Sequence, residues 1–154
     1  MEINFFVFIL HTIPEWIGII FFTLVLYNSL IEYWRKGIIL ALIMAAMTYV
    51  LRLFIPVTFG LHSLALIALA VVVFRIKLKF DYVFLIKGIL SSSFIIILGE
   101  LLSHFLFVSI LNIPMNEILN NTFFLLMFGW IPIIILLTII VLLHTKKILV
   151  LKKR

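Results

Sequence analysis

The fold is decided first by residues 3–31, which read INFFVFILHTIPEWIGIIFFTLVLYNSLI. This run is almost entirely apolar, and it exceeds the roughly 20 residues that an upright helix needs to cross a bilayer. More apolar runs follow along the 154-residue chain, of which 66% is hydrophobic and only 12% is charged. That charged fraction is about half the value for a globular domain. The composition therefore predicts an all-α, polytopic integral membrane protein.

The opening run contains a signal for a helix start. Residues 12–15, Thr-Ile-Pro-Glu, match a capping box with proline in the first turn. They predict that a first span covers residues 13–33, preceded by a short apolar segment at 3–11 in or on the leaflet. The alternative is one long helix that kinks at Pro14. The start of the chain lacks the basic stretch of a secretory signal peptide, so we expect it to be kept.

Four further spans are predicted, which gives a five-helix bundle that forms a single transmembrane domain over residues 1–154. Residues 34–37, Trp-Arg-Lys-Gly, form a basic turn after the first span, and Pro56 ends the second span. The fourth span is polar for a membrane helix, so we expect it to face neighbouring helices rather than lipid. The further spans are about 38–55, 61–76, 82–111 and 122–145.

The basic residues predict an orientation. Ten of the twelve Lys and Arg residues lie at the first and third connections or at the C-terminus, Lys87 lies near the inner end of the fourth span, and Arg52 is the exception. The positive-inside rule then puts the N-terminus outside and the C-terminus in the cytoplasm. Because these charges sit in short turns, we expect them to contact anionic membrane lipids and no nucleic acid.

Five ionisable residues fall at about the same depth, in the outer leaflet, when these spans are threaded through a bilayer. Ionisable side chains in hydrocarbon are expensive and are retained where they pair or bind something. Glu100 and His104 lie four residues apart on one helix face, and His11 and Glu15 would share a face in the same way if that segment were one continuous helix. The five residues are Glu15, Arg52, His62, Glu100 and His104.

A functional interpretation makes this cluster a ligand pocket that opens to the outside. Arg52 would bind a carboxylate or phosphate group, because its guanidinium presents paired donors to such oxygens. Glu15 and Glu100 would hold or gate the arginine, and His62 and His104 would complete the polar lining. A purely structural interpretation makes Arg52 the partner of Glu15 or Glu100 in a buried ion pair, with no ligand.

Other chemistry finds less support in the sequence. The chain has no cysteine and no His-Glu-x-x-His motif, so we expect neither a metal site nor another cofactor. Ser91, Ser92, Ser93 and Ser103 lie in the fourth span, where hydroxyls usually bond the helix backbone, so we expect no enzyme activity.

Residues 49–62, YVLRLFIPVTFGLH, together with Glu15 and Glu100, resemble the N-terminal membrane region of some Firmicutes sensor kinases and related small membrane proteins. The resemblance covers nearly the whole chain. It implies that Arg52, Gly60 and His62 occupy polar and turn positions of the motif, and that the protein senses or regulates at the outer face. No dimerisation or ATP-binding domain follows Arg154, so the resemblance implies a separate partner or a truncated sensor.

We therefore expect a multi-pass protein of the bacterial cytoplasmic (inner) membrane that recognises a small, anionic ligand or peptide and signals to a partner. That partner would be a kinase, a regulator or a transporter subunit, at the cytoplasmic face or in the membrane. Two alternatives stay open, namely a substrate-binding subunit of a transporter and a structural scaffold or assembly protein. Assembly as a homo-oligomer is left open as well.

Overall fold

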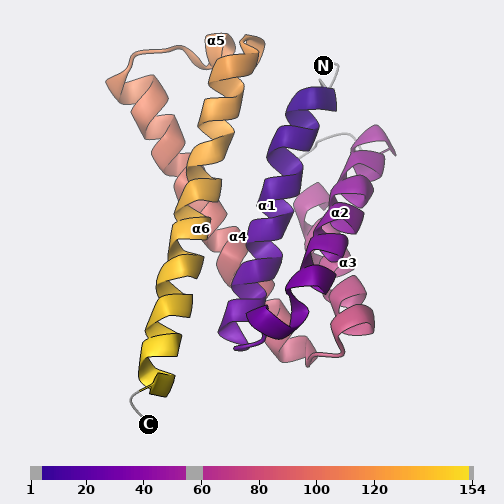
Figure 1. Cartoon of the computed structure of the whole chain (residues 1–154). Coiled ribbons are helices and arrows are strands. Elements are labelled where there is room, and N and C mark those ends of the chain that lie inside the picture. The colour runs from indigo at the N-terminus through magenta and orange to yellow at the C-terminus, as the bar shows by residue number, and fades with distance from the viewer. Residues whose placement is uncertain (1–4, 55–60, 153–154) are drawn as a thin grey trace.

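The computed structural model describes residues 5–54 and 61–152, and it describes their side chains except at 5, 7, 52–54, 61–64 and 147–152. These residues form helices joined by short connections, and no strand occurs among them (Figure 1). The N-terminus and α5 lie at one end of the molecule and the C-terminus lies at the other. In chain order the elements are α1 (Phe5–Leu26), α2 (Leu30–Phe54), α3 (Leu61–Leu78), α4 (Tyr82–His104), the π-helix η1 (Phe105–Ile110), α5 (Met115–Asn120) and α6 (Thr122–Lys152).

The predicted all-helical class is confirmed. Within the described residues, four helical segments are long and apolar enough to cross a membrane. They are Phe8–Leu26, Leu30–Leu51, Tyr82–Ile110 and Thr122–Lys146. The shorter α3 occupies the predicted third span and is not one of these four.

Helix α1 forms the centre of the bundle, because it packs against α2, α4 and α6. Its side chains Ile20 and Leu24 are completely buried. In a bilayer such packing is favoured by van der Waals contact rather than by the removal of apolar surface from water. The central helix therefore holds the others in place through the fit of its side chains.

Glycines bring α4 close to two other helices. Gly99 of α4 lies against Pro132 of α6, and a Cβ atom on Gly99 would stand 2.5 Å from the Cα of Pro132. About three turns earlier on the same side of α4, a Cβ atom on Gly88 would stand 2.6 Å from a methyl carbon of Thr23 in α1. Such small residues let helix backbones approach each other in membranes.

The predicted helix start at residues 12–15 is wrong, because α1 continues through Pro14. The Thr12 side chain is buried, and its hydroxyl has no hydrogen-bond partner among the described residues, so it does not cap a helix. Phe8 and Trp16, on either side of the proline, are also buried. Their packing keeps the helix in one piece, although Pro14 cannot donate a backbone hydrogen bond. The predicted separate N-terminal segment is, from residue 5 onward, the first part of α1.

The first connection also differs from the prediction. It lies at residues 27–29, and residues 34–37 form part of α2 instead of a turn. Asn28 has a φ of 58°, in the left-handed region that ends helices and that asparagine tolerates better than most residues. Gly37 is buried, and a Cβ atom there would come within 3.1 Å of the Phe21 ring. This glycine therefore allows α1 and α2 to pack closely and does not make a turn.

The later spans agree better with the sequence prediction. Helix α4 with η1 ends one residue before the predicted span, and α6 continues beyond residue 145 to Lys152. The predicted stop at Pro56 lies outside the described residues. Helix α4 faces its neighbours on one side only, because Ser92 and Ser103 are fully buried whereas Phe94 is 61% exposed. The prediction that this span faces neighbouring helices is therefore wrong for its exposed side.

Candidate functional site

A pocket of about 260 Å³ lies among α1, α2, α3 and α4. Six of its lining side chains are apolar, as expected inside a bundle of apolar helices. The other five can form hydrogen bonds or carry charge, which makes this pocket unlike the apolar core around α1. The lining residues are Trp16, Ile19, Leu66, Ile67, Ile96 and Ile97, with the polar residues His11, Glu15, Thr48, Ser93 and Glu100.

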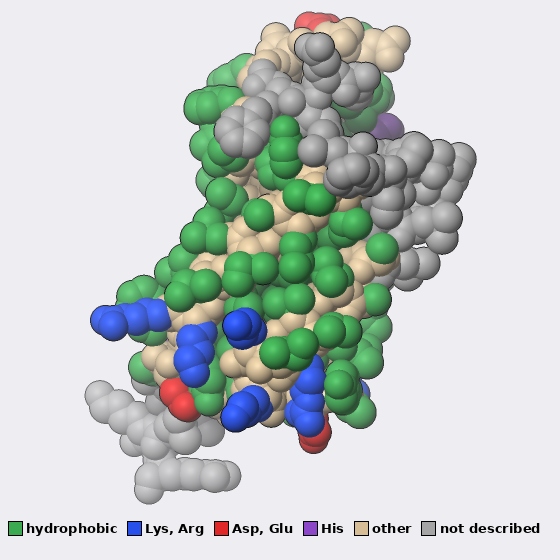
Figure 2. Space-filling view, turned by 90° about the vertical axis from the view of Figure 1, so that its right-hand side faces the viewer, with side chains coloured by type: hydrophobic (Ala, Val, Ile, Leu, Met, Phe, Trp, Pro, Cys, Tyr) green, Lys and Arg blue, Asp and Glu red, His purple; other side chains and the backbone are tan. Residues whose placement is uncertain are grey.

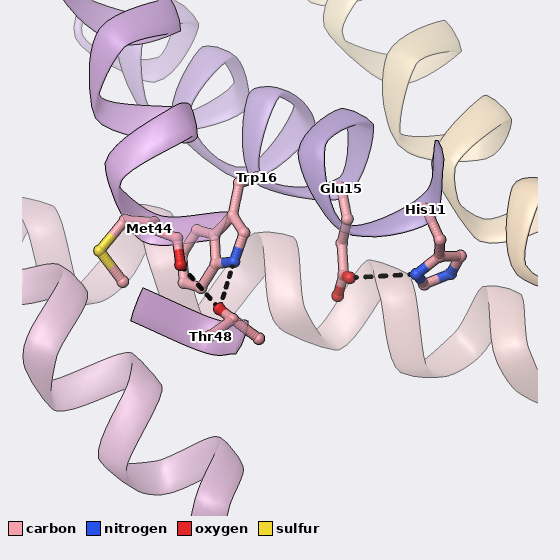
Figure 3. Close-up of polar contacts among 5 residues, drawn as sticks. All are labelled: His11, Glu15, Trp16, Met44 and Thr48. Atoms are coloured by element: carbon pink, nitrogen blue, oxygen red, sulfur yellow. Dashed lines mark hydrogen bonds and ion pairs between the residues drawn. The ribbon is translucent and has the colours of Figure 1, made fainter. Parts of the chain in front are cut away.

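Helix α1 contributes an imidazole and a carboxylate one turn apart. Nδ1 of His11 lies 3.6 Å from a carboxylate oxygen of Glu15, and both side chains are about a quarter exposed (Figure 3). This pair exists because α1 is helical through Pro14, which puts residues four apart on one face. The shared face expected for a continuous helix is thus confirmed.

Helix α6 fixes the other side of the histidine. The His11 ring lies against Gly129, where a Cβ atom would overlap the ring atoms Cδ2 and Nε2. No larger residue fits at position 129 unless the imidazole moves. The ring of His11 is therefore held between the Glu15 carboxylate and the backbone of α6.

A hydrogen-bond chain joins α1 to α2 at the wall of the pocket. The indole nitrogen of Trp16 donates to the hydroxyl of Thr48 over 2.9 Å, and that hydroxyl donates to the Met44 carbonyl over 2.8 Å (Figure 3). Both side chains are buried. A buried indole N–H needs such an acceptor, since an unpaired donor is costly in an apolar surrounding.

Helix α4 supplies a second carboxylate. The four α4 residues of the lining, at positions 93, 96, 97 and 100, have the spacing of one helix face. Two of them, Ser93 and Glu100, are polar and stand two turns apart. Glu100 and Glu15 thus line one pocket from different helices. The chemistry that this lining offers is hydrogen bonding and charge recognition at its rim.

The structure brings together only some of the predicted site residues. Glu15 and Glu100 line the pocket. His104, the last residue of α4, is exposed and does not line it. Arg52 lies in α2 one turn after Thr48, and His62 lies near the start of α3, but both side chains are outside the described ones. Their predicted roles stay predictions.

Thr48 is a lining residue that the sequence analysis missed. Its position four residues before Arg52 was a usable signal, because residues so spaced share a helix face. Ser93 was interpreted only as a backbone-bonding residue, and it lies on the pocket face of α4.

No three His, Asp or Glu side chains gather as a metal site would require, within the part of the chain whose side chains are described. Comparison with protein-family models, curated proteins and solved structures finds no significant match. The function must therefore be argued from the pocket and from the helices around it.

Proposed function

We propose that this protein is a multi-pass membrane protein that recognises a small charged ligand or peptide in the pocket among α1 to α4. The observation that carries the proposal is the lining itself, in which the partly buried His11 and Glu15 and the exposed Glu100 line one open pocket among apolar helices. Ionisable groups at such positions are expensive to insert and mark ligand or ion sites by default. A pocket of about 260 Å³ suits a small molecule or the end of a peptide.

The proposed topology has five spans, with α3 as the third, an outside N-terminus and a cytoplasmic C-terminus. It is supported by the gathering of Lys and Arg side chains in the lower part of the face seen in Figure 2. The positive-inside rule would put that end in the cytoplasm. The pocket would then open in the outer half of a bacterial cytoplasmic membrane.

The proposed ligand carries an anionic group, for which Arg52 is the predicted partner. Glu15 and Glu100 favour a positive group in the same ligand. A small peptide carries both, because its carboxylate would suit the arginine and its ammonium group would suit the carboxylates. A short peptide with both termini free is therefore the ligand that best matches Arg52 and the two carboxylates together.

The proposed role is sensing or regulation, in which a cytoplasmic or membrane partner responds to pocket occupancy. The same pocket would serve the substrate-binding subunit of a transporter. The protein that copurifies from mild detergent distinguishes these roles, since a kinase or regulator favours sensing and an ATPase favours transport. A scaffold would show no dependence on any ligand.

The test is thermal stability of the purified protein in an uncharged detergent, measured with short peptides, small carboxylates, phosphate and small amines. A ligand that binds only the folded state raises the midpoint with concentration. Glu100→Gln should lose the shift given by amines and peptides, and Arg52→Ala should lose the shift given by anions and peptides. Glu117→Gln is the matched control, because Glu117 is an exposed carboxylate in α5.

Two outcomes contradict the proposal. One is that none of these ligands stabilises the wild type. The other is that Glu100→Gln and Glu117→Gln respond alike to every ligand. If Arg52→Ala also fails to fold, the arginine is a structural ion-pair partner, and the scaffold alternative is favoured.

A further inference from the structure

A second pocket of about 240 Å³ lies between α2 and α3, away from the polar pocket. It is an open groove with two cationic side chains, one from each helix, and an apolar floor from α2. It belongs to the part of the molecule where Lys and Arg side chains gather over a hydrophobic surface (Figure 2). Its lining consists of Lys36, Ile39, Leu40, Ile43 and Lys77.

The groove changes from charged to apolar along α2. Positions 36, 39, 40 and 43 share one helix face, so the ammonium group of Lys36 precedes a stripe of three aliphatic side chains. Leu40 is buried, but Ile39 is 58% exposed. An exposed aliphatic side chain beside two cations is a surface that fits an amphipathic molecule.

The two lysines are available for an anion. Lys36 lies with its ammonium nitrogen 5.1 Å from the centre of the Tyr33 ring, which restrains the side chain without neutralising it. Both Lys36 and Lys77 are exposed, and neither makes an ion pair with a carboxylate among the described residues. The nearby Arg75 is engaged differently, since its guanidinium donates to the backbone carbonyls of Lys79 and Phe80.

We propose that this groove binds an anionic phospholipid. The phosphate would lie between Lys36 and Lys77, and one acyl chain would lie along Ile39, Leu40 and Ile43. Basic pockets between membrane helices at the cytoplasmic side are suited to anionic headgroups. The inference rests on the membrane placement in the proposed function and is independent of ligand binding in the polar pocket.

The alternative is general attraction of anionic lipid to every basic residue at this end. The two cases differ, because general attraction depends on the number of charges, whereas a site depends on these two lysines and on the apolar floor. A matched pair of lysines outside the groove therefore separates them. Lys87 and Lys146 form such a pair, since both are exposed and neither lines the groove.

The experiment is native mass spectrometry of delipidated protein in an uncharged detergent, titrated with phosphatidylglycerol or phosphatidylcholine. Wild type and Lys87→Gln/Lys146→Gln should retain one phosphatidylglycerol tightly. Lys36→Gln/Lys77→Gln should bind it about tenfold more weakly or worse, because two charge contacts are lost. Lys36→Arg/Lys77→Arg should restore binding, and phosphatidylcholine should bind weakly to every variant.

A second arm tests the apolar floor. Ile43→Trp keeps both lysines but fills the groove, so it should also lose the tight phosphatidylglycerol. Soluble glycerol phosphate should not compete, because it lacks the acyl chain. The proposal is overturned if the two lysine pairs have equal effects, if Ile43→Trp binds like the wild type, or if glycerol phosphate competes fully.

Thermal midpoints measured without lipid identify any variant that has lost its fold. If Ile43→Trp has lost its fold, the lysine variants alone decide the question. Peptide-induced stabilisation, measured on Lys36→Gln/Lys77→Gln, should be unchanged. Loss of lipid binding with an intact peptide response supports the groove and the ligand pocket as two separate sites. Lipid binding without any peptide response supports the groove and contradicts the proposed ligand pocket.

Discussion

The indole nitrogen of Trp16 donates a 2.9 Å hydrogen bond to the hydroxyl of Thr48, and this bond joins the central helix α1 to α2 beside the polar pocket. The same hydroxyl donates a hydrogen bond to the Met44 carbonyl. Each partner thus satisfies a polar group that would be costly to leave unpaired in an apolar bundle. The bond fixes the position of α2 relative to the pocket face of α1.

Thr48→Val should lower the free energy of unfolding by about 0.5–2 kcal/mol, because the buried Trp16 N–H loses its acceptor while the shape of the side chain is kept. Trp16→Phe should leave Thr48 bonded to Met44. A double-mutant cycle with these two variants, followed by denaturant titration in mixed micelles, should give a coupling free energy above zero. Additive effects would show that the bond contributes nothing to stability.

Gly99→Ala should destabilise the bundle by about 1–3 kcal/mol, the usual range for overpacking. The added methyl group would stand 2.5 Å from the Cα of Pro132, and a helix backbone cannot move aside without separating α4 from α6. The measurement is the thermal midpoint in detergent.

Gly37→Ala is the matched control for that variant. The nearest neighbours of its added methyl group would be the side chains of Phe21, Leu24 and Ile20, at 3.1 Å or more. Those side chains can shift slightly, and alanine favours the helix over glycine by about 0.5–1 kcal/mol. Gly37→Ala should therefore change the midpoint far less, and equal loss in both variants would contradict the role of the Gly99–Pro132 contact.

The positions of the helices were predicted well from the sequence, because a long apolar run can satisfy its backbone in a membrane only as a helix. The prediction of the first connection failed for a local reason. The basic residues 34–37 resemble a turn, but the left-handed conformation of Asn28 ends the helix earlier. At Pro14 the helix continues, because buried Phe8 and Trp16 outweigh one missing backbone hydrogen bond.

The candidate pocket was only partly predictable. Glu15 and Glu100 stood out because a charge in an apolar run is conspicuous wherever it points. Thr48 and Ser93 did not, because these helices are apolar on all sides and their sequences give little indication of which face turns inward. The rotation of each helix is set by contacts such as Trp16 with Thr48, which connect residues far apart in the chain.

The phenol of Tyr27 predicts that the stability of the protein depends on pH in the alkaline range. Burial raises the pKa of its phenol above the ordinary value of 10.0, and the negative charge of Asp81 raises the pKa further. The unfolded state therefore loses this proton first as pH rises past 10.0, so the stability contributed by the neutral phenol declines there.

Tyr27→Phe should keep the stacking on Phe80, whose ring centre lies 4.4 Å away, and it removes the titrating group. The midpoint of the wild type should fall more steeply than that of Tyr27→Phe as pH rises past 10.0. Lysines titrate in both proteins, so only the difference between them reports on Tyr27. Parallel curves would show that the phenol has the same pKa in both states.

The proposed orientation can be tested with single cysteines, because the chain has none of its own and the wild type gives no background labelling. Asp81 lies between the basic end of α3 and the start of α4, and Asn116 lies in α5 beyond the other end of α4; both are exposed. In intact cells, a membrane-impermeant maleimide should label Asn116→Cys, and it should label Asp81→Cys only after permeabilisation. This is expected because Arg75, Lys77 and Lys79 would keep the α3–α4 connection in the cytoplasm under the positive-inside rule. The reverse pattern would invert the molecule and put the polar pocket in the inner half, whereas labelling of both in intact cells would mean that α4 does not cross the membrane.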